Sequence, residues 1–343
     1  MKKFYGVIGN PPYQEQTTGT SDKPIYNYFM DESYSVGLKV ELITPARFLF
    51  NAGKTPKEWN RKMLSDPCFR VLSYTQASGA VFPNTDIKGG VAISYRDESK
   101  VYGAIETFTA FEELNTVFRK VSNDSRFSSF SSIVYTSDAY CFTKAFHSDY
   151  PSVKERLSVG HEDDLVTHII DTASEAFQEE RPDESEGYVQ IYGRAKGNRG
   201  SFYIKAAYII ARVANFEKWK VLLPKSNGSG ALGETLSTPL IGQPLIGHTQ
   251  TFISIGCFET EPEAEACLKY VQTKFARALL GVLKITQHNP SSTWKYVPLQ
   301  NFTSTSNIDW SKSIPEIDQQ LYAKYGLDEK EIAFIESHVK EMS

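Results

Sequence analysis

Cysteine is scarce in this chain of 343 residues, and what there is lies scattered. Cys68, Cys141, Cys257 and Cys267 form no CxxC pair, and the six histidines form no HxH or HExxH pattern. This spacing argues against a zinc site and against a disulfide framework, and it is typical of reduced cytosolic thiols. We therefore expect no metal ion and a cytoplasmic protein.

Long apolar runs and a strong charge of either sign are also missing. No stretch reaches the roughly 18 consecutive apolar residues of a membrane helix, and MKKFYGVIG contains no apolar segment long enough for a secretory signal. The formal net charge is −4, so a nucleic acid could be bound only through a local basic patch. The hydrophobic content of 41% and aromatic content of 13% are sufficient for a packed core, and the length indicates about two domains.

Short apolar runs alternate with polar connections over the first hundred residues, which is typical of an α/β fold. Strands are expected over residues 4–8, from Lys39 into a loop at Pro45, and over residues 69–76 and 89–97. Helical spacing of apolar residues predicts two helices, one through Ile25, Phe29 and Met30 and one through Trp59 and Met63.

The stretch VIGNPPYQ, residues 7–14, stops the first of these strands at an amide and two prolines. The side-chain oxygen of Asn10 and the carbonyl of Pro11 are two acceptors, and each can accept a hydrogen bond from one N–H of adenine's exocyclic amine. These two hydrogen bonds free the lone pair of the nitrogen for attack on a methyl sulfonium. Pro12 pins Pro11 in an extended conformation, and Tyr13 offers a ring to a base removed from the duplex. The alternative is a Pro-Pro turn capped by Asn10.

Charge divides the second half of the chain. Residues 161–186 hold ten carboxylates against Arg181 alone, which is typical of a solvated helix and linker. Residues 187–230 hold eight Lys/Arg against Glu217 alone, interleaved with aromatic residues. This mixture suits a polyanion that presents flat bases, and it equally suits a solvated face over an aromatic core. Further on, residues 262–284 predict one long amphipathic helix, and the tail predicts two short helices around Gly326.

Five segments together resemble a known family. VIGNPPY, PIYNYFMDES, LITPARFLF, VLSYTQASGAVFP and DIKGGVAISYRD are similar, in order, to motifs IV to VIII of the adenine DNA methyltransferases of restriction–modification systems. After Gly187, the segments KVLLPKSNGSG, HTQTFISIG, KFARALLG and WKYVPLQNF resemble the target-recognition part of the same enzymes. Protein glutamine methyltransferases also use NPPY, so the ordered set carries the resemblance.

The resemblance implies a role for several residues. Asn10, Pro11, Pro12 and Tyr13 would be the catalytic loop, and Tyr95 would pack its ring against a flipped adenine. Lys88 could meet a phosphate. The alternatives are an ordinary strand aromatic for Tyr95 and an exposed strand-end lysine for Lys88. DNA contacts are expected from Arg194, Lys196, Arg199 and Lys205.

The methyl-donor site of the family is not found in this sequence. S-adenosylmethionine is the implied donor, but only nine residues precede Asn10, where the glycine-rich loop and the first three strands would lie. GSGALG, Gly228 to Gly233, has the GxGxxG spacing, yet the Pro-containing ETLSTPLIGQPLIG that follows predicts no helix, and the expected acidic residue is absent from residues 249–256. A flexible loop is the expectation for GSGALG.

A sheet that begins at its fourth strand would leave an unpaired edge. An upstream-encoded methylase subunit, a truncated gene product or a different cap would each account for it. We expect a partial Rossmann-like methyltransferase sheet in residues 1–150, an acidic linker in 151–186 and an α+β target-recognition domain in 187–343.

The expected function is site-specific transfer of a methyl group to adenine N6 in double-stranded DNA, with a flipped adenine and with a methylase subunit or restriction endonuclease as further partner. No membrane partner is expected. The alternatives are a non-catalytic DNA-binding specificity protein that retains a methylase half-domain, and an unrelated nucleotide-dependent enzyme that uses GSGALG. A helix starting at Gly230 would favour the last of these.

Overall fold

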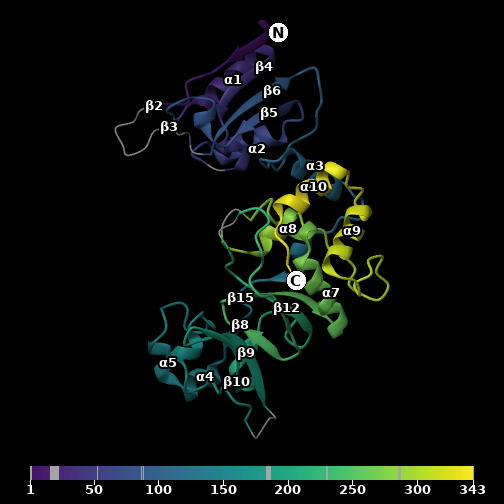
Figure 1. The fold of residues 1–343 in the computed structure, drawn as a ribbon. Coiled ribbons are helices and arrows are strands. Elements are labelled where there is room, and N and C mark those ends of the chain that lie inside the picture. Colours follow the sequence, from purple (N-terminus) through teal and green to yellow (C-terminus); the bar gives the residue numbers. More distant parts are fainter. Residues whose placement is uncertain are drawn as a thin grey trace. The chain divides into compact units, whose positions relative to one another are not determined.

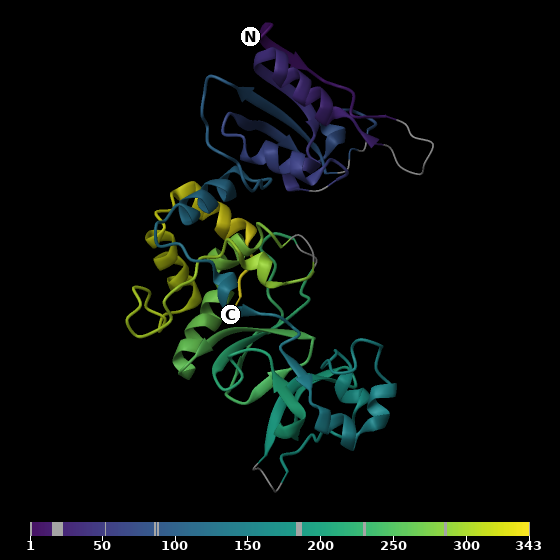
Figure 2. The ribbon, with the colours of Figure 1, turned by 180° about the vertical axis from the view of Figure 1, so that it is seen from behind.

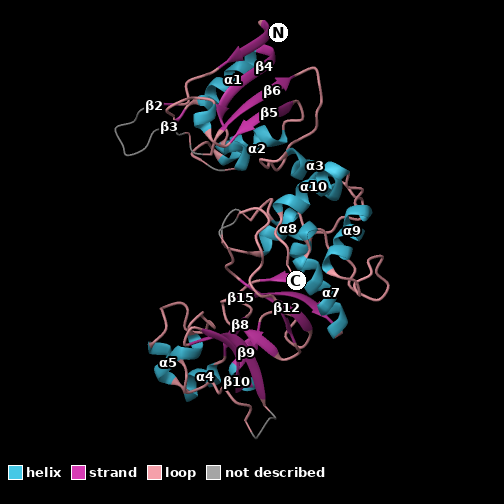
Figure 3. Cartoon of the chain, viewed as in Figure 1, coloured by secondary structure: helices cyan, strands magenta, loops and turns pink. Residues whose placement is uncertain are grey.

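The chain is a mixed α/β protein with several separate sheets (Figure 3). This computed structural model describes residues 2–15, 23–51, 53–85, 87, 89–182, 187–228, 231–284 and 287–342. Two compact units, Met1–Asn115 and Thr116–Ser343, divide it. The break therefore lies about 35 residues before the boundary expected near residue 150. Within the described ranges no helix has the length and apolar character needed to cross a membrane.

A four-stranded sheet with the order β1-β4-β6-β5 organises the first unit (Figure 1). Strand β1 pairs in parallel with β4, and β6 runs antiparallel to both of its neighbours. The strands agree with the four ranges expected from the sequence. Their bounds are Phe4–Gly9 for β1, Gly37–Pro45 for β4, Phe69–Thr75 for β5 and Val91–Asp97 for β6.

Two helices, α1 (Tyr26–Val36) and α2 (Lys57–Ser65), cover one face of this sheet. Met30 of α1 and Met63 of α2 are buried in the same core cluster as Val40 of β4. Burial of each such side chain contributes about 1.5–3 kcal/mol, so this cluster fixes which face of the sheet the helices cover. The short strands β2 (Gln14–Glu15) and β3 (Lys23–Pro24) pair beside it.

Strand β1 lies at an edge of the sheet, because β4 is its only partner in the part of the chain that the structure describes. Its apolar residues are unusually exposed: 56% for Phe4, 72% for Tyr5 and 84% for Ile8. An edge strand with free N–H and C=O groups and apolar side chains is a template for further pairing. This is the unpaired edge expected from the sequence.

The second unit contains an antiparallel sheet with the order β13-β12-β15-β7, and a separate sheet with the order β10-β9-β14 (Figure 2). A two-stranded ladder joins β8 (Tyr140–Phe142) to β11 (Ile209–Ala211). The other strand bounds are Val134–Tyr135 for β7, Tyr188–Ala195 for β9, Asn198–Lys205 for β10, Trp219–Pro224 for β12, Leu240–Gly242 for β13, Ile246–His248 for β14 and Phe252–Phe258 for β15.

The single long helix expected over residues 262–284 is divided into α7 (Glu261–Gln272) and α8 (Lys274–Leu280). Thr273 causes the break: its backbone leaves the helical region, and its hydroxyl accepts a hydrogen bond from the N–H of Ala276 at the start of α8. In the tail, α9 (Ile314–Lys324) and α10 (Glu329–His338) flank Gly326, whose φ is +62°. The two expected tail helices are thus confirmed. Helix α3 spans Glu112–Ser122.

The acidic stretch expected to be a linker is instead packed into the second unit. Leu165, Ile169, Ile170 and Phe177 are buried in a cluster that includes Ile191 of β9. Periodic burial of these apolar residues is compatible with carboxylates that point outward, which is why the charge count alone indicated a linker. The helices of this region are α4 (Lys144–Asp149), α5 (Pro151–Glu155) and α6 (Ile169–Thr172).

Candidate functional site

The loop Asn10–Tyr13 follows directly from the carboxyl end of β1, where Gly9 pairs with Leu42 of β4. Asn10 is exposed and Pro11 is half-buried. Among the residues that the structure describes, neither the Asn10 side chain nor the Pro11 carbonyl has a hydrogen-bond partner. Two strong acceptors therefore stand next to each other at a strand end with their hydrogen-bonding capacity free.

Tyr13 anchors the end of this loop. Its carbonyl accepts a hydrogen bond from the N–H of Ile25 at 3.1 Å, and its half-buried ring packs against the core cluster on the helix-covered side of the sheet. Burial raises the pKa of the Tyr13 hydroxyl to about 12, and that hydroxyl has no partner in the described part of the chain. The hydroxyl end of the Tyr13 ring is thus buried against the core, while the residue as a whole is half-buried.

Phe82 is the aromatic residue that the structure brings to Tyr13, and sequence reasoning did not single it out. The two rings meet edge to face with centroids 6.3 Å apart. Ser78 shapes the loop that carries Phe82: its carbonyl accepts from the Phe82 N–H at 2.8 Å, and its hydroxyl accepts from the Ile87 N–H at 2.8 Å. The sequence could have pointed to Phe82, because this residue lies near the end of VLSYTQASGAVFP, a segment that resembles a methyltransferase motif.

Tyr95 lies elsewhere on the sheet. Its register partners are Glu41 and Arg70, so β4 separates it from β1, and it faces the side opposite the α1–α2 core. Its hydroxyl is 3.3 Å from Asp97, and the Arg70 guanidinium lies 5.5 Å from its ring centroid. The role expected for Tyr95 beside a flipped base stays a prediction. Lys88 lies outside the described residues.

The four basic residues expected to contact DNA lie on one hairpin, formed by β9 and β10. Lys196 (φ +49°) and Gly197 (φ +85°) make its two-residue turn, and left-handed backbone at both positions is what such tight hairpin turns require. Arg194 stands directly opposite Arg199. All four basic residues, Arg194, Lys196, Arg199 and Lys205, are exposed, and none forms an ion pair with a described carboxylate.

Other basic residues of the same stretch have internal roles. Lys218 pairs with Glu259, and Arg212 lies 3.9 Å from Asp164. Lys220 is fully buried and donates to the carbonyls of Asn215, Phe216, Lys218 and Gln243. The structure thus concentrates the free positive charge of this stretch on the hairpin.

The glycine-rich loop GSGALG does not open a helix: no helix lies between β12 and β13 over the described residues, which exclude Ser229 and Gly230. The carbonyl of Gly233 accepts from the Lys340 N–H and from the guanidinium of buried Arg277. The Gly233 carbonyl is therefore used in hydrogen bonds within the protein. The described residues of GSGALG thus lack the helix that a methyl-donor or dinucleotide loop opens, and the condition for a nucleotide-dependent enzyme using this loop is not met. In the same described ranges, no cluster of His, Cys, Asp or Glu could hold a metal ion.

Comparison with known proteins agrees with the class expected from the Asn10 loop. Residues 1–82 match the family model described as Eco57I restriction-modification methylase. That match covers β1, β4, β5 and both aromatic residues of the loop region, Tyr13 and Phe82. The amino-terminal segment is thus restriction-modification methylase-like.

Two solved structures are similar over most of the chain. The type IIG restriction endonuclease BpuSI aligns over 93% of this chain and 48% of its own, with 8% identity and a TM-score of 0.31. The type IIL restriction-modification enzyme MmeI, solved in complex with DNA, aligns over 97% of this chain and 56% of its own, with 9% identity and a TM-score of 0.37. The chain spans about half the length of these two proteins. No curated protein matches it.

Proposed function

We propose that this chain is the catalytic-loop and target-recognition part of a site-specific adenine DNA methyltransferase of a restriction–modification system. The observation that carries the proposal is the pair of unpartnered acceptors, the Asn10 amide oxygen and the Pro11 carbonyl, at the end of β1. The match of residues 1–82 to a restriction-modification methylase family supports it.

The chemistry assigned to this loop is activation of a planar amine. The lone pair of adenine N6 is delocalised into the ring, so the nitrogen is a poor nucleophile. Hydrogen bonds from its two N–H groups to Asn10 and Pro11 favour a tetrahedral nitrogen, whose lone pair is localised and points away from the acceptors. Donors or acceptors aimed at a transition state in this way are typically worth about 10²–10³ in rate each.

Tyr13 and Phe82 form the surface on which the extruded base rests. A target base has to leave the duplex before chemistry on its edge is possible. Stacking of one base on an aromatic ring contributes about 1–3 kcal/mol, and the contact of Phe82 with Tyr13 keeps the Tyr13 ring in one orientation.

GSGALG is not part of the proposed donor site, because its described residues open no helix and the Gly233 carbonyl is used in internal hydrogen bonds. The exposed edge of β1, with Ile8 84% exposed, is where further strands of a methyltransferase sheet would pair. DNA is held by the β9–β10 hairpin through Arg194, Lys196, Arg199 and Lys205.

A second candidate is a non-catalytic DNA-binding specificity protein that retains the methylase half-domain. The observation that favours it is that the described residues of GSGALG, which has the GxGxxG spacing, open no helix. The two candidates differ in whether the Asn10 loop performs chemistry.

The identity of the product tests the proposal. The chain is combined with the polypeptide that supplies the donor site, radiolabelled S-adenosylmethionine and duplex DNA, and the DNA is digested to nucleosides. The proposal expects label in N6-methyl-2′-deoxyadenosine. Label in methylcytosine, or no label while the chain still binds the duplex, would contradict adenine methylation and favour the specificity protein.

A further inference from the structure

The β9–β10 hairpin presents one polar face. Because side chains alternate along a strand, every second residue lies on the same face. Val189, Ile191, Phe202 and Ile204 are buried in the core cluster, so their neighbours form the opposite face. That face consists of four cross-strand pairs, none with an acidic member: Tyr188 with Lys205, Gln190 with Tyr203, Tyr192 with Ser201, and Arg194 with Arg199.

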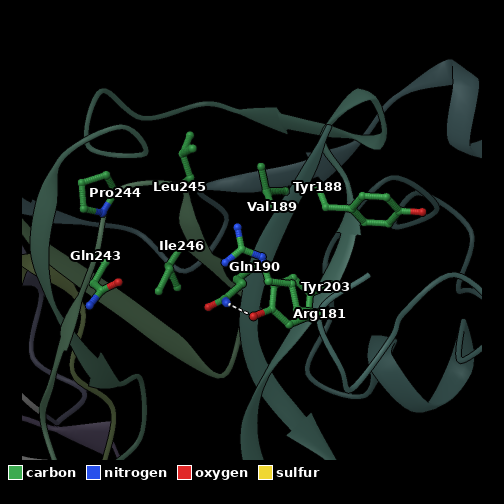
Figure 4. A pocket seen from close by; sticks show the side chains of 9 residues that line it. All are labelled: Arg181, Tyr188, Val189, Gln190, Tyr203, Gln243, Pro244, Leu245 and Ile246. Carbon is green, nitrogen blue, oxygen red and sulfur yellow. Dashed lines mark hydrogen bonds between the residues drawn. The ribbon is translucent and has the colours of Figure 1, made fainter. Parts of the chain in front are cut away.

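A pocket of about 170 Å³ lies beside Gln190 (Figure 4). Its polar lining comes from three elements of the second unit: Arg181 before the hairpin, Gln190 and Tyr203 within it, and Gln243 from the loop before β14. In Figure 4 the Gln190 amide points toward the Tyr203 hydroxyl, whereas the Tyr188 ring turns away from it. None of the described residues that line this pocket carries a carboxylate.

The polar groups of the pocket are oriented and incompletely used. The Gln190 Nε2 donates to the Tyr203 hydroxyl at 2.6 Å, which fixes the amide. Its Oε1, and the hydroxyl proton of Tyr203, have no partner among the described residues. Glutamine and arginine side chains match the donor and acceptor patterns of adenine and guanine edges, respectively.

The loop that carries Gln243 is held rigidly. Leu245 has a φ of +65°, an uncommon conformation for a residue with a branched side chain. Its N–H donates to the Phe216 carbonyl at 2.9 Å, and its carbonyl accepts from the Gln190 N–H at 3.2 Å. The buried ammonium of Lys220 holds the Gln243 carbonyl at 3.1 Å. A site fixed in this way loses little conformational entropy when it binds.

We propose that this pocket reads the edge of a base pair in duplex DNA, with Gln190, Gln243 and Arg181 as the reading side chains. The inference rests on the proposed function and names the residues that select the target sequence. A two-stranded ribbon fits the major groove of B-form DNA. The outer part of the hairpin is such a ribbon, because the pairing of β9 with β14 ends at Tyr192.

The hairpin tip favours a duplex over a free nucleotide as the ligand. Arg194 and Arg199 face each other across the strands, and like charges at directly opposite positions are destabilising without a counter-ion. A phosphate between them relieves that repulsion. The tip lies four residues from Gln190 along β9, which is about 13 Å at the usual strand rise. A ligand that places a base edge in the pocket and a phosphate at the tip must span this distance, as a duplex does and a free nucleotide does not.

Selection of bound duplexes from a randomised pool tests the inference. The full chain is compared with Gln190→Leu and Gln243→Ala, which remove hydrogen bonding in the pocket. Gln287→Leu, at an exposed glutamine outside the pocket, is the matched control. An Arg194→Ala/Arg199→Ala variant tests the tip, and circular dichroism confirms folding of each protein.

The wild-type chain and the Gln287→Leu control should select the same sequence. Gln190→Leu and Gln243→Ala should each lose discrimination at one or two adjacent base pairs, by about 5- to 150-fold for a bidentate contact, while total duplex binding persists. The tip variant should keep the sequence preference, and its slope of log affinity against log salt should fall by about 1–2.

Two results would overturn the inference, and they distinguish failure of the inference alone from failure of the proposed function as well. If the folded pocket variants keep the wild-type preference, or if the wild type binds duplexes without preference, the pocket reads no base although DNA binding stands. If the wild type binds no duplex, the proposed function fails together with the inference.

Discussion

His248 is a buried histidine whose surroundings forbid its charged form. It is fully buried, its Nδ1 lies 3.0 Å from the carbonyl of Thr249, and its Nε2 has no partner in the described part of the chain. The Tyr140 ring packs against it, and the Lys220 ammonium lies close enough to repel a second positive charge. Burial, followed by this repulsion, lowers the pKa of His248 to about 4.

The lowered pKa predicts loss of stability in mild acid. The unfolded chain binds a proton near pH 6.5, whereas the folded chain binds it only near pH 4, so the free energy of unfolding falls as the pH falls between these values. The expected loss from this residue is about 2 kcal/mol between pH 7 and pH 5. Denaturant unfolding of the wild type and His248→Gln at both pH values measures it.

The exposed His168 gives the matched control, His168→Gln, which should keep the wild-type acid sensitivity. If His248→Gln loses as much stability between pH 7 and pH 5 as the wild type does, the acid sensitivity has another source and the description of the His248 environment is wrong.

At the residue scale, sequence reasoning predicted positions that depend on local chain order and missed contacts between residues far apart in the sequence. Asn10 and Pro11 follow a strand in the sequence, and they follow it in the structure. Phe82 contacts Tyr13, about 70 positions away in the sequence, and the Gln243 carbonyl accepts from Lys220, 23 positions away. The buried Lys220 was counted among surface cations, because composition does not show that carbonyls surround its ammonium.

Among the elements, β1 is followed directly by the Asn10–Tyr13 loop and lies at an exposed sheet edge. The apolar residues on this strand remain in contact with solvent, and Ile8 is 84% exposed. Natural edge strands are usually protected by charges, prolines or bulges, and Pro11 and Pro12 come only after β1 ends. The edge therefore favours pairing with another strand.

Ile8→Lys should reduce self-association of the purified chain without loss of stability. Ile8 is too exposed to contribute to the core, so the free energy of unfolding should change by no more than about 0.5 kcal/mol. A lysine at an edge opposes strand pairing. Sedimentation velocity over a range of concentrations measures association, and denaturant unfolding measures stability.

Val159→Lys changes an equally apolar residue, 93% exposed, that lies in no strand, and it should leave association unchanged. If the Ile8→Lys chain associates as strongly as the wild type, the edge of β1 does not mediate self-association.

Element positions were more predictable than element ends. Alternating or helical spacing of apolar residues predicted β1, β4, β5, β6, α1 and α2, because burial against one core imposes that spacing. The break between α7 and α8 was not predicted, because the apolar spacing continues through Thr273 and only its capping hydrogen bond reveals the interruption.

For the whole molecule, the two units carry different candidate sites. The first has its own core and carries the Asn10 loop. The second carries the hairpin, the pocket and a core that includes residues between Ala139 and Tyr208. The acidic stretch before the hairpin supplies much of that core, so a boundary at residue 187 would divide it.

A fragment of residues 112–343, which begins with helix α3, should fold and bind duplex DNA with strong salt dependence. Each phosphate contact should add about 0.9 to the slope of log affinity against log salt. A fragment of residues 187–343 should be unfolded, because it lacks Tyr140, Phe146 and Ile169 of the core cluster. Circular dichroism and fluorescence anisotropy over several salt concentrations measure both. Folding of the shorter fragment would contradict the assignment of the core.

The rate of methyl transfer by Asn10→Ala tests the central claim most directly. In the complete enzyme, with its donor site supplied, this variant should transfer methyl groups at least about 10²-fold more slowly than the wild type, because one of the two acceptors for the amine is lost. Its affinity for duplex DNA, measured in the same preparation, should stay within about twofold, because phosphate contacts from the hairpin supply most of the binding. Asn10→Ala with the wild-type rate would show that Asn10–Tyr13 is only a turn and would contradict the account.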